Sequence, residues 1–232
     1  MPRVPRYFII SDDAQFHITW QCHNKSWFLR SESSKQLYYN LLLKYKSQYN
    51  VKIYSYSFMS SHPHLTGYCS TQKGLSDFMR VVNSIFAQHI NRVEKRCGQA
   101  IRDRFKSPQI QDDEHLFKVM MYVDLNPVRA KMVRHPGNYK WTSYHYYAHG
   151  TPDPLIDPAP IYLMLGATPK ERQEAYRRHV QKYLQEEGLI KHNYSCVHAI
   201  GNPEWVLPRQ QIIEAYLKEY RERYAEQKKG DP

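Results

Sequence analysis

The chain has 232 residues, of which 41% are hydrophobic and 24% are charged, and its formal net charge is +11. This is the composition of an ordinary globular protein, long enough for one domain with a full core or for one domain with a small appendage. No run approaches about 18 apolar residues, which argues against a membrane span. The first six residues lack the apolar core of a signal peptide.

The positive charge is concentrated in the first two thirds of the chain. Residues 1–165 hold 21 Lys and Arg against 12 Asp and Glu, whereas residues 166–232 hold 12 against 10. An excess of this kind favours a polyanionic partner, most simply nucleic acid, over a basic protein without such a partner. The 20 tyrosines suit stacking on unpaired bases, but we expect most of them to be half-buried on strands and helix flanks.

The cysteines are too widely spaced for a structural zinc ribbon, since no Cys-x-x-Cys pair occurs. Reduced thiols in a cytoplasm are the simplest interpretation, and we expect a cytoplasmic protein. The four are Cys22, Cys69, Cys97 and Cys196.

A first strand is predicted over residues 14–23, where apolar and polar side chains alternate. His17 and His23 belong to its polar set, which we expect to face away from the core; service as a third metal ligand is the less favoured alternative. Ser31 then caps an amphipathic helix that ends near Asn50.

Two histidines follow a second predicted strand, Val51–Met59, in the run Ser-Ser-His-Pro-His-Leu at residues 60–65. His62 and His64 are i and i+2, so in an extended chain they point the same way. Neutral imidazole is a common ligand for divalent metals, although ordinary hydrogen bonding is the usual fate of an isolated His-x-His. Pro63 restricts the segment to an edge strand or a strand end.

A cationic segment follows a short strand over residues 65–69 and a strong helix from Gly74 to Val93. Arg102, Arg104 and Lys106 alternate, so an extended backbone presents them on one face as a rail for phosphates. A solvated edge protected from aggregation by its charge is the alternative.

The next predicted helix begins at Asp112 and carries Tyr122 and Asn126 at i and i+4. Pro127 disfavours helical geometry at Asn126, so this residue is a candidate N-cap of a short helix as well as a candidate metal ligand. Tyr122 is a candidate nucleophile, and a packed tyrosine with a bonded hydroxyl is its alternative.

The C-terminal part is predicted to be helical and separate. Residues 1–150 are expected to form the main domain, residues 151–167 a Pro-rich linker, and residues 168–232 a helical appendage. A capping box, Thr168–Glu171, opens a helix to Gly188, and Pro208 opens a last amphipathic helix.

Two stretches, Ser60–Leu65 and Met121–Ala130, resemble the HUH single-tyrosine (Y1) transposases, IS200-like proteins, and within them the branch associated with repetitive extragenic palindromes (REP). The family has a strand ending in His-hydrophobic-His and a helix carrying Tyr-x-x-x-Asn-Pro-Val-Arg-Ala. The resemblance extends from about Arg6 to Tyr144. Ser61 replaces the family's usual Asn, and Pro63 its usual aliphatic residue.

The resemblance implies an α+β, ferredoxin-like fold with an antiparallel sheet, the histidines on a central strand and the tyrosine helix facing them. It implies metal-dependent cleavage and strand transfer of single-stranded DNA, with hairpins of the REP type as candidate substrates, through a 5′-phosphotyrosine at Tyr122. The metal would be Mg²⁺ or Mn²⁺, held by His62, His64 and Asn126. The expected DNA-binding residues are Arg102, Arg104, Lys106, Arg129 and Lys131.

Two other functions compete with this interpretation. A domesticated DNA-binding regulator would bind DNA with little or no cleavage. A hydrolytic metallophosphoesterase would cut DNA without forming a covalent adduct. Metal binding without cleavage would support the regulator, and trapping the adduct distinguishes the phosphoesterase from the transposase mechanism.

Overall fold

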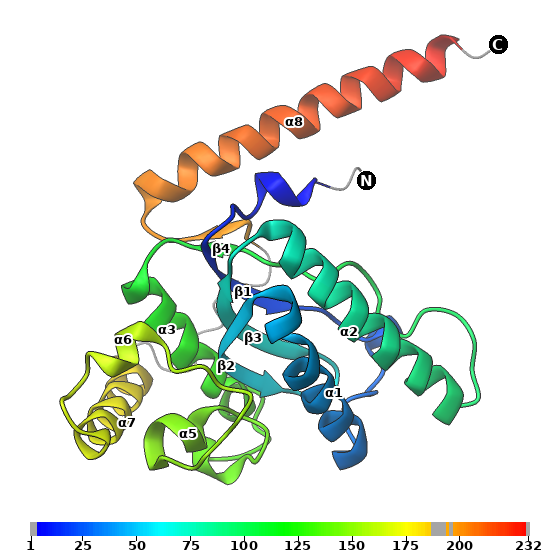
Figure 1. Ribbon diagram of the computed structural model, residues 1–232. Helices are drawn as coiled ribbons and strands as arrows, with labels where there is room; N and C mark the ends of the chain where they lie inside the picture. Colours follow the sequence, from blue (N-terminus) through cyan, green and yellow to red (C-terminus); the bar gives the residue numbers. More distant parts are fainter. Residues whose placement is uncertain (1–3, 187–193, 195–196, 231–232) are drawn as a thin grey trace.

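The computed structural model describes residues 4–186, 194 and 197–230 and shows a mixed five-stranded sheet with helices on both faces (Figure 1). The strand order is β2-β3-β1-β4-β5. The first four strands are antiparallel to their neighbours, as the α+β prediction requires, whereas β5 runs parallel to β4. The strands are β1 (Ala14–Thr19), β2 (Val51–Phe58), β3 (Pro63–Cys69), β4 (Gln109–Ile110) and β5 (Ala199–Ile200).

Two helices cover one face of the sheet and a third covers the other (Figure 1). α1 (Glu32–Tyr45) and α2 (Gln72–Val93) lie on the first face, and α3 (Asp113–Asp124) packs against β2 and β3 on the second. Side-chain oxygens cap all three by accepting a backbone N–H, which satisfies donors that have no partner inside a helix. The N-cap of α2 is Thr71, so this helix begins two residues before the predicted Gly74.

The remaining helical elements are short or lie in the C-terminal half. The α-helices are α4 (Asn126–Arg129), α5 (Tyr144–His149), α6 (Pro160–Leu163), α7 (Pro169–Glu186) and α8 (Pro203–Gly230), and the 3₁₀ helices are η1 (Arg6–Phe8), η2 (His23–Lys25), η3 (Ser47–Tyr49) and η4 (Pro136–Asn138).

The first strand is buried on both faces, which corrects the prediction that His17 lies on a polar outer face. Phe16 and Ile18 belong to the hydrophobic core, and His17, on the opposite face, is also 0% exposed. The reason is tertiary, because β1 pairs with β3 on one side and β4 on the other, while the rings of Tyr122 and Tyr194 lie against His17 on the second face. A period-2 pattern identifies a strand but does not show what covers its polar side.

His62 lies in the turn between β2 and β3 and His64 lies on β3, and backbone hydrogen bonds from elsewhere in the chain hold the turn. Cys22 N donates to Ser61 O at 2.9 Å, and Leu29 N donates to Ser60 O at 3.0 Å. Pro63 is the first residue of β3, which confirms the strand-end prediction. The central position of β3 in the sheet also agrees with the expected placement of the histidines.

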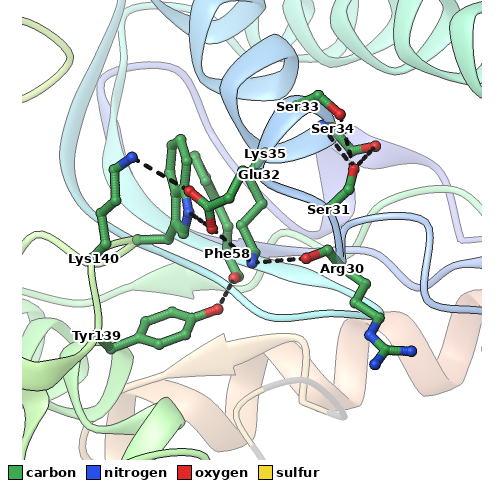
Figure 2. Close-up of polar contacts among 10 residues, drawn as sticks. Arg30, Ser31, Glu32, Ser33, Ser34, Lys35, Phe58, Tyr139 and Lys140 are labelled. Carbon is green, nitrogen blue, oxygen red and sulfur yellow. Dashed lines mark hydrogen bonds and ion pairs between the residues drawn. The ribbon is translucent and has the colours of Figure 1, made fainter.

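The end of β2 is joined to α1 by the segment before α5 (Figure 2). The Tyr139 hydroxyl donates to Phe58 O at 2.6 Å, and Trp141 Nε1 donates to Glu32 Oε1 at 2.8 Å in the first turn of α1. Lys140 forms an ion pair with the same carboxylate at 3.3 Å. These contacts fix the strand that leads into the histidine turn.

Residues 151–167, predicted to be a linker, contribute side chains to the core. Leu155 and Ala159 are fully buried. Asp157 accepts hydrogen bonds from Lys46 Nζ at 2.8 Å and from Ile53 N at 2.9 Å, so this segment is held against β2. The division of the chain into a main domain and a helical C-terminal region remains a prediction.

A buried carboxylate connects α7 to α3. Asp124 accepts hydrogen bonds from Thr142 Oγ1 at 2.7 Å, from Ser143 Oγ and from the Tyr176 hydroxyl at 2.6 Å. Burial raises the pKa of Asp124 to about 6, and the three hydroxyl donors act against that rise. Because Tyr176 lies on α7, this network attaches the C-terminal region to the helix that carries Tyr122.

The last two predicted helices differ from expectation only at their ends. Thr168 and Glu171 exchange the bonds of the predicted capping box, and α7 is described to Glu186, so Gly188 lies outside the described residues. α8 begins five residues before the predicted Pro208, which lies inside it. It runs beside the N-terminal segment (Figure 1), where Phe8 and Tyr216 have ring centroids 4.9 Å apart. Within the described residues, no helix has the length and apolarity needed to span a bilayer.

We expect Tyr176→Phe to lower the free energy of unfolding by about 1–3 kcal/mol, because it leaves the buried Asp124 carboxylate short of one donor. Urea denaturation followed by circular dichroism measures this difference. Tyr7→Phe, at a tyrosine that is 65% exposed, is the control and should change stability by less than about 0.5 kcal/mol. Equal effects of the two substitutions would contradict this role for the Asp124 network.

Candidate active site

Three aromatic side chains from two distant parts of the sequence meet where α3 faces β3. The rings of His62 and His64 have centroids 4.9 Å apart, and the Tyr122 ring lies 5.9 Å from His64 at an interplanar angle of 88°. Tyr122 is 5% exposed. The structure thus brings together the two predicted stretches and places the tyrosine helix against the histidine strand, as the sequence indicated.

Each histidine has one ring nitrogen engaged and one available. His62 Nδ1 lies 2.9 Å from Ser61 Oγ, and His64 Nδ1 lies 3.0 Å from Nε2 of His17. Nε2 of His62 and Nε2 of His64 make no hydrogen bond with the described residues. Two imidazole nitrogens are therefore left for a ligand.

The rings are held in the neutral form, which is the form that binds metals. Burial lowers the pKa of His62 to about 4. Burial, followed by the neighbouring His62, His17 and Arg129, holds the pKa of His64 well below its usual value. Protonation therefore does not compete with metal binding at neutral pH.

Asn126 is not an N-cap, contrary to one of the two roles predicted for it. Leu125 occupies the N-cap position of α4 without a side-chain cap. The Asn126 Nδ2 instead donates backwards to Tyr122 O at 3.1 Å and to Val123 O at 3.4 Å. Its carboxamide oxygen takes part in neither bond.

These donors fit a divalent cation with mixed nitrogen and oxygen ligands. No group of three His, Cys, Asp or Glu side chains suited to a metal occurs in the part of the chain that the structure describes. A third protein ligand at the histidine pair would therefore come from another residue type, and the unengaged oxygen of the buried Asn126 is of the right chemistry. Amide oxygen is a usual ligand of Mg²⁺ and Mn²⁺, and imidazole is a usual ligand of divalent transition metals.

Arg129 lies against the tyrosine rather than on an open surface. Its Nη1 donates to Tyr122 O at 2.9 Å, and its guanidinium carbon lies 4.6 Å from the centroid of the Tyr122 ring. The Nε and Nη2 atoms of Arg129 are buried and have no hydrogen-bond partner among the described residues. Unpartnered N–H donors on the positively charged Arg129 guanidinium can bind an anion.

The predicted cationic rail borders the same site. Arg102, Arg104, Lys106 and His62 line one cavity of about 160 Å³. Antiparallel bridges join Lys106 to Thr19 at the end of β1 and Ile101 to Cys22 beyond it, and all three rail cations are exposed. By contrast, Lys131 is exposed beyond the end of α4, and no described hydrogen bond or ion pair joins its side chain to the site.

Two neighbours of Tyr122 were not expected there from the sequence, which offered His17 only as a less favoured metal ligand and gave no role to Tyr194. His17 lies with its ring 6.2 Å from Tyr122, and Tyr194 lies 4.9 Å from Tyr122 and 6.4 Å from His17. The position of His17 on the polar side of a strand was visible in the sequence, and only the strand order shows that this side faces the site. Nothing local to Tyr194 indicated its place.

Comparison with known proteins finds one matching family model and several solved structures with a similar fold. Residues 10–124 match the family model described as "Transposase IS200 like". A solved structure of a REP-associated tyrosine transposase bound to a REP hairpin is 18% identical and has a TM-score of 0.55; the match covers 68% of this chain and 92% of that one. A putative transposase from Deinococcus radiodurans R1 is 14% identical with a TM-score of 0.36, over 53% of this chain and 96% of that one. The curated proteins give no match.

Proposed function

We propose that this chain, which belongs to the IS200-like, single-tyrosine transposase family, cleaves single-stranded DNA and joins the cut end to a new strand through a covalent bond to Tyr122. Family membership places it among DNA strand transferases. The observation that carries the mechanism is the convergence of Tyr122, His62 and His64, with ring centroids no more than 5.9 Å apart between neighbours.

His62, His64 and Asn126 would hold one divalent cation, Mg²⁺ or Mn²⁺. Such a site would supply Lewis-acid polarisation of the scissile phosphate when the ion is bound. The residues contribute two imidazole nitrogens and an amide oxygen. Ser61 and His17 hold the other nitrogens of the two rings.

The Tyr122 oxygen attacks the phosphorus, and the phenol gives up its proton. A bond forms between Oη and phosphorus, the bond between phosphorus and the 3′-oxygen breaks, and the 3′-hydroxyl leaves with a proton. The product is a 5′-phosphotyrosine that conserves the phosphodiester energy, so a second 3′-hydroxyl can reverse the step without ATP. Arg129, fixed over the Tyr122 ring, would donate its unpartnered Nε and Nη2 to a phosphate oxygen.

The substrate would be single-stranded DNA with a hairpin. The net charge of the first 165 residues and the rail beside His62 support a polyanion that passes along Arg102, Arg104 and Lys106. Lys131 would add an outer phosphate contact. The REP hairpin in the similar solved structure supports a hairpin ligand, and a cytoplasmic location agrees with a DNA substrate.

We expect Tyr122→Phe to abolish both cleavage and the covalent protein–DNA adduct, because it removes only the attacking oxygen. Folding, Mn²⁺ binding and DNA binding should persist. Labelled hairpin oligonucleotides incubated with Mn²⁺ and run on denaturing gels measure cleavage and adduct together. Tyr68→Phe, at a tyrosine on β3 bonded to Asp13, is the control and should form the adduct normally.

The same assay separates the competing functions. Cleavage by the wild-type protein without an adduct would favour a hydrolytic phosphoesterase. DNA binding without cleavage in the presence of bound Mn²⁺ would favour a DNA-binding regulator. Wild-type cleavage by Tyr122→Phe would show that another group is the attacker.

The double substitution His62→Ala with His64→Ala should abolish Mn²⁺ binding measured by calorimetry, because it removes both imidazole ligands. Asn126→Ala should weaken binding without abolishing it, since two ligands remain. His89→Ala, at a half-buried histidine on α2 that contacts Arg92, should leave the affinity unchanged. Wild-type affinity in the double variant would place the metal elsewhere.

Each of Arg102→Gln, Arg104→Gln and Lys106→Gln should weaken DNA binding and reduce the salt dependence of that binding. The slope of log affinity against log salt should fall by about 0.7 for every phosphate that the variant no longer binds. Fluorescence anisotropy over a salt series gives the slope. Arg223→Gln removes a cation from the exposed surface of α8 and should leave the slope unchanged; equal slopes in all four variants would exclude the rail.

A further inference from the structure

His17 forms a contact with the site that none of the expected motifs assigns. It lies in the middle of β1 with no exposed surface, and its Nε2 is 3.0 Å from Nδ1 of His64. The two imidazoles are almost parallel, with an interplanar angle of 3° and centroids 5.2 Å apart. A buried hydrogen bond between two neutral imidazoles is directional, because only one of the two nitrogens can carry the proton.

The direction of this bond decides whether His64 can be a metal ligand. If His64 Nδ1 carries the proton, Nε2 of His64 has a free lone pair. If Nε2 of His17 carries the proton, His64 must accept at Nδ1, and its own proton then occupies Nε2 and blocks a cation. The tautomer of His17 is therefore coupled to the ligand competence of His64.

The surroundings of His17 favour the arrangement that leaves His64 competent. Nδ1 of His17 is buried and makes no well-formed hydrogen bond to the described residues. The backbone of Tyr194 lies close to this ring and offers it a hydrogen-bond acceptor. A proton on Nδ1 is directed towards that acceptor, and Nε2 of His17 is then free to accept from His64.

We propose that His17 is a positioning residue that holds His64 as the Nδ1-protonated tautomer and so presents Nε2 of His64 to a divalent cation. Its Nε2 is occupied by this bond, so His17 supports a ligand and is not itself the third ligand. Ser61 has the corresponding place at Nδ1 of His62. The inference rests on the proposed metal site and adds the residue that orients one of its ligands.

A purely structural role for His17 makes different predictions. In that case the His17–His64 bond only satisfies two buried polar groups, and any well-packed replacement would preserve the site. His17→Phe keeps the ring and the packing but has no acceptor. His17→Gln restores an acceptor oxygen close to the position of Nε2, so comparison of the two variants isolates the hydrogen bond from the packing.

Mn²⁺ titration of the full chain without DNA tests the inference. We expect His17→Phe to bind Mn²⁺ about 10–100-fold more weakly than the wild type, as is common when a residue that orients a metal ligand is replaced. His17→Gln should recover most of the affinity. Thr66→Val is the matched control, because it breaks the buried bond between Ser55 and Thr66 at 2.6 Å on the same face of the sheet, and it should bind Mn²⁺ normally.

A second measurement requires no substitution. ¹⁵N NMR of the metal-free wild-type protein with labelled histidines should find His64 protonated at Nδ1 and unprotonated at Nε2. The opposite tautomer would overturn the inference, as would wild-type Mn²⁺ affinity in His17→Phe or equal weakening in His17→Phe and His17→Gln. Failure of the wild type to bind Mn²⁺ would instead overturn the proposed metal site, and this inference with it.

Discussion

The register between β1 and β3 determines whether this chain has a site at all. His17 lies opposite Thr66, and Thr19 lies opposite His64, so the two histidines are diagonal neighbours on one face of the sheet. A slip of one residue would turn His64 towards α1 and α2. Gly67 helps to exclude such a slip, because a Cβ there would lie 2.0 Å from Lys52 O and 2.8 Å from the Phe16 ring. Close packing around Gly67 on the apolar face thus helps to set the register that places His17 and His64 together on the opposite face.

The face beneath α3 is unusual because much of it is polar and still fully buried. Ser55 on β2 bonds Thr66 on β3, and His17 on β1 bonds His64, also on β3. Burying polar groups is costly unless they are hydrogen-bonded to one another. Once bonded, they constrain the orientation of their side chains more than apolar contacts do. The Asp124 network extends this polar layer to α7. The helix that carries Tyr122 is therefore held, through Asp124, by directional bonds to the segment before α5 and to α7.

The parts of the structure that could be predicted from sequence are those with a local signal. The strand before the histidines, the capped helices and the spacing of Tyr122 and Asn126 are all encoded within short stretches. The burial of His17 depends on which element covers β1, and β5 is a two-residue strand that pairs with β4 from about 90 residues away. Asp124 had no local signal either, because its three donors come from two distant segments.

The motif Tyr-x-x-x-Asn-Pro-x-Arg also has a physical reason that the sequence alone did not reveal. Pro127 has no N–H for Val123 O, its acceptor in a continuous helix, so α3 stops and α4 begins. The Asn126 side chain donates to Val123 O in its place and also to Tyr122 O, to which Arg129 Nη1 donates as well. The residues that end the helix thus replace the missing bonds and immobilise the Tyr122 backbone. Because Asn126 uses only its nitrogen in these two bonds, its oxygen remains for the proposed cation. One short motif thus both positions the proposed nucleophile and completes the proposed ligand set.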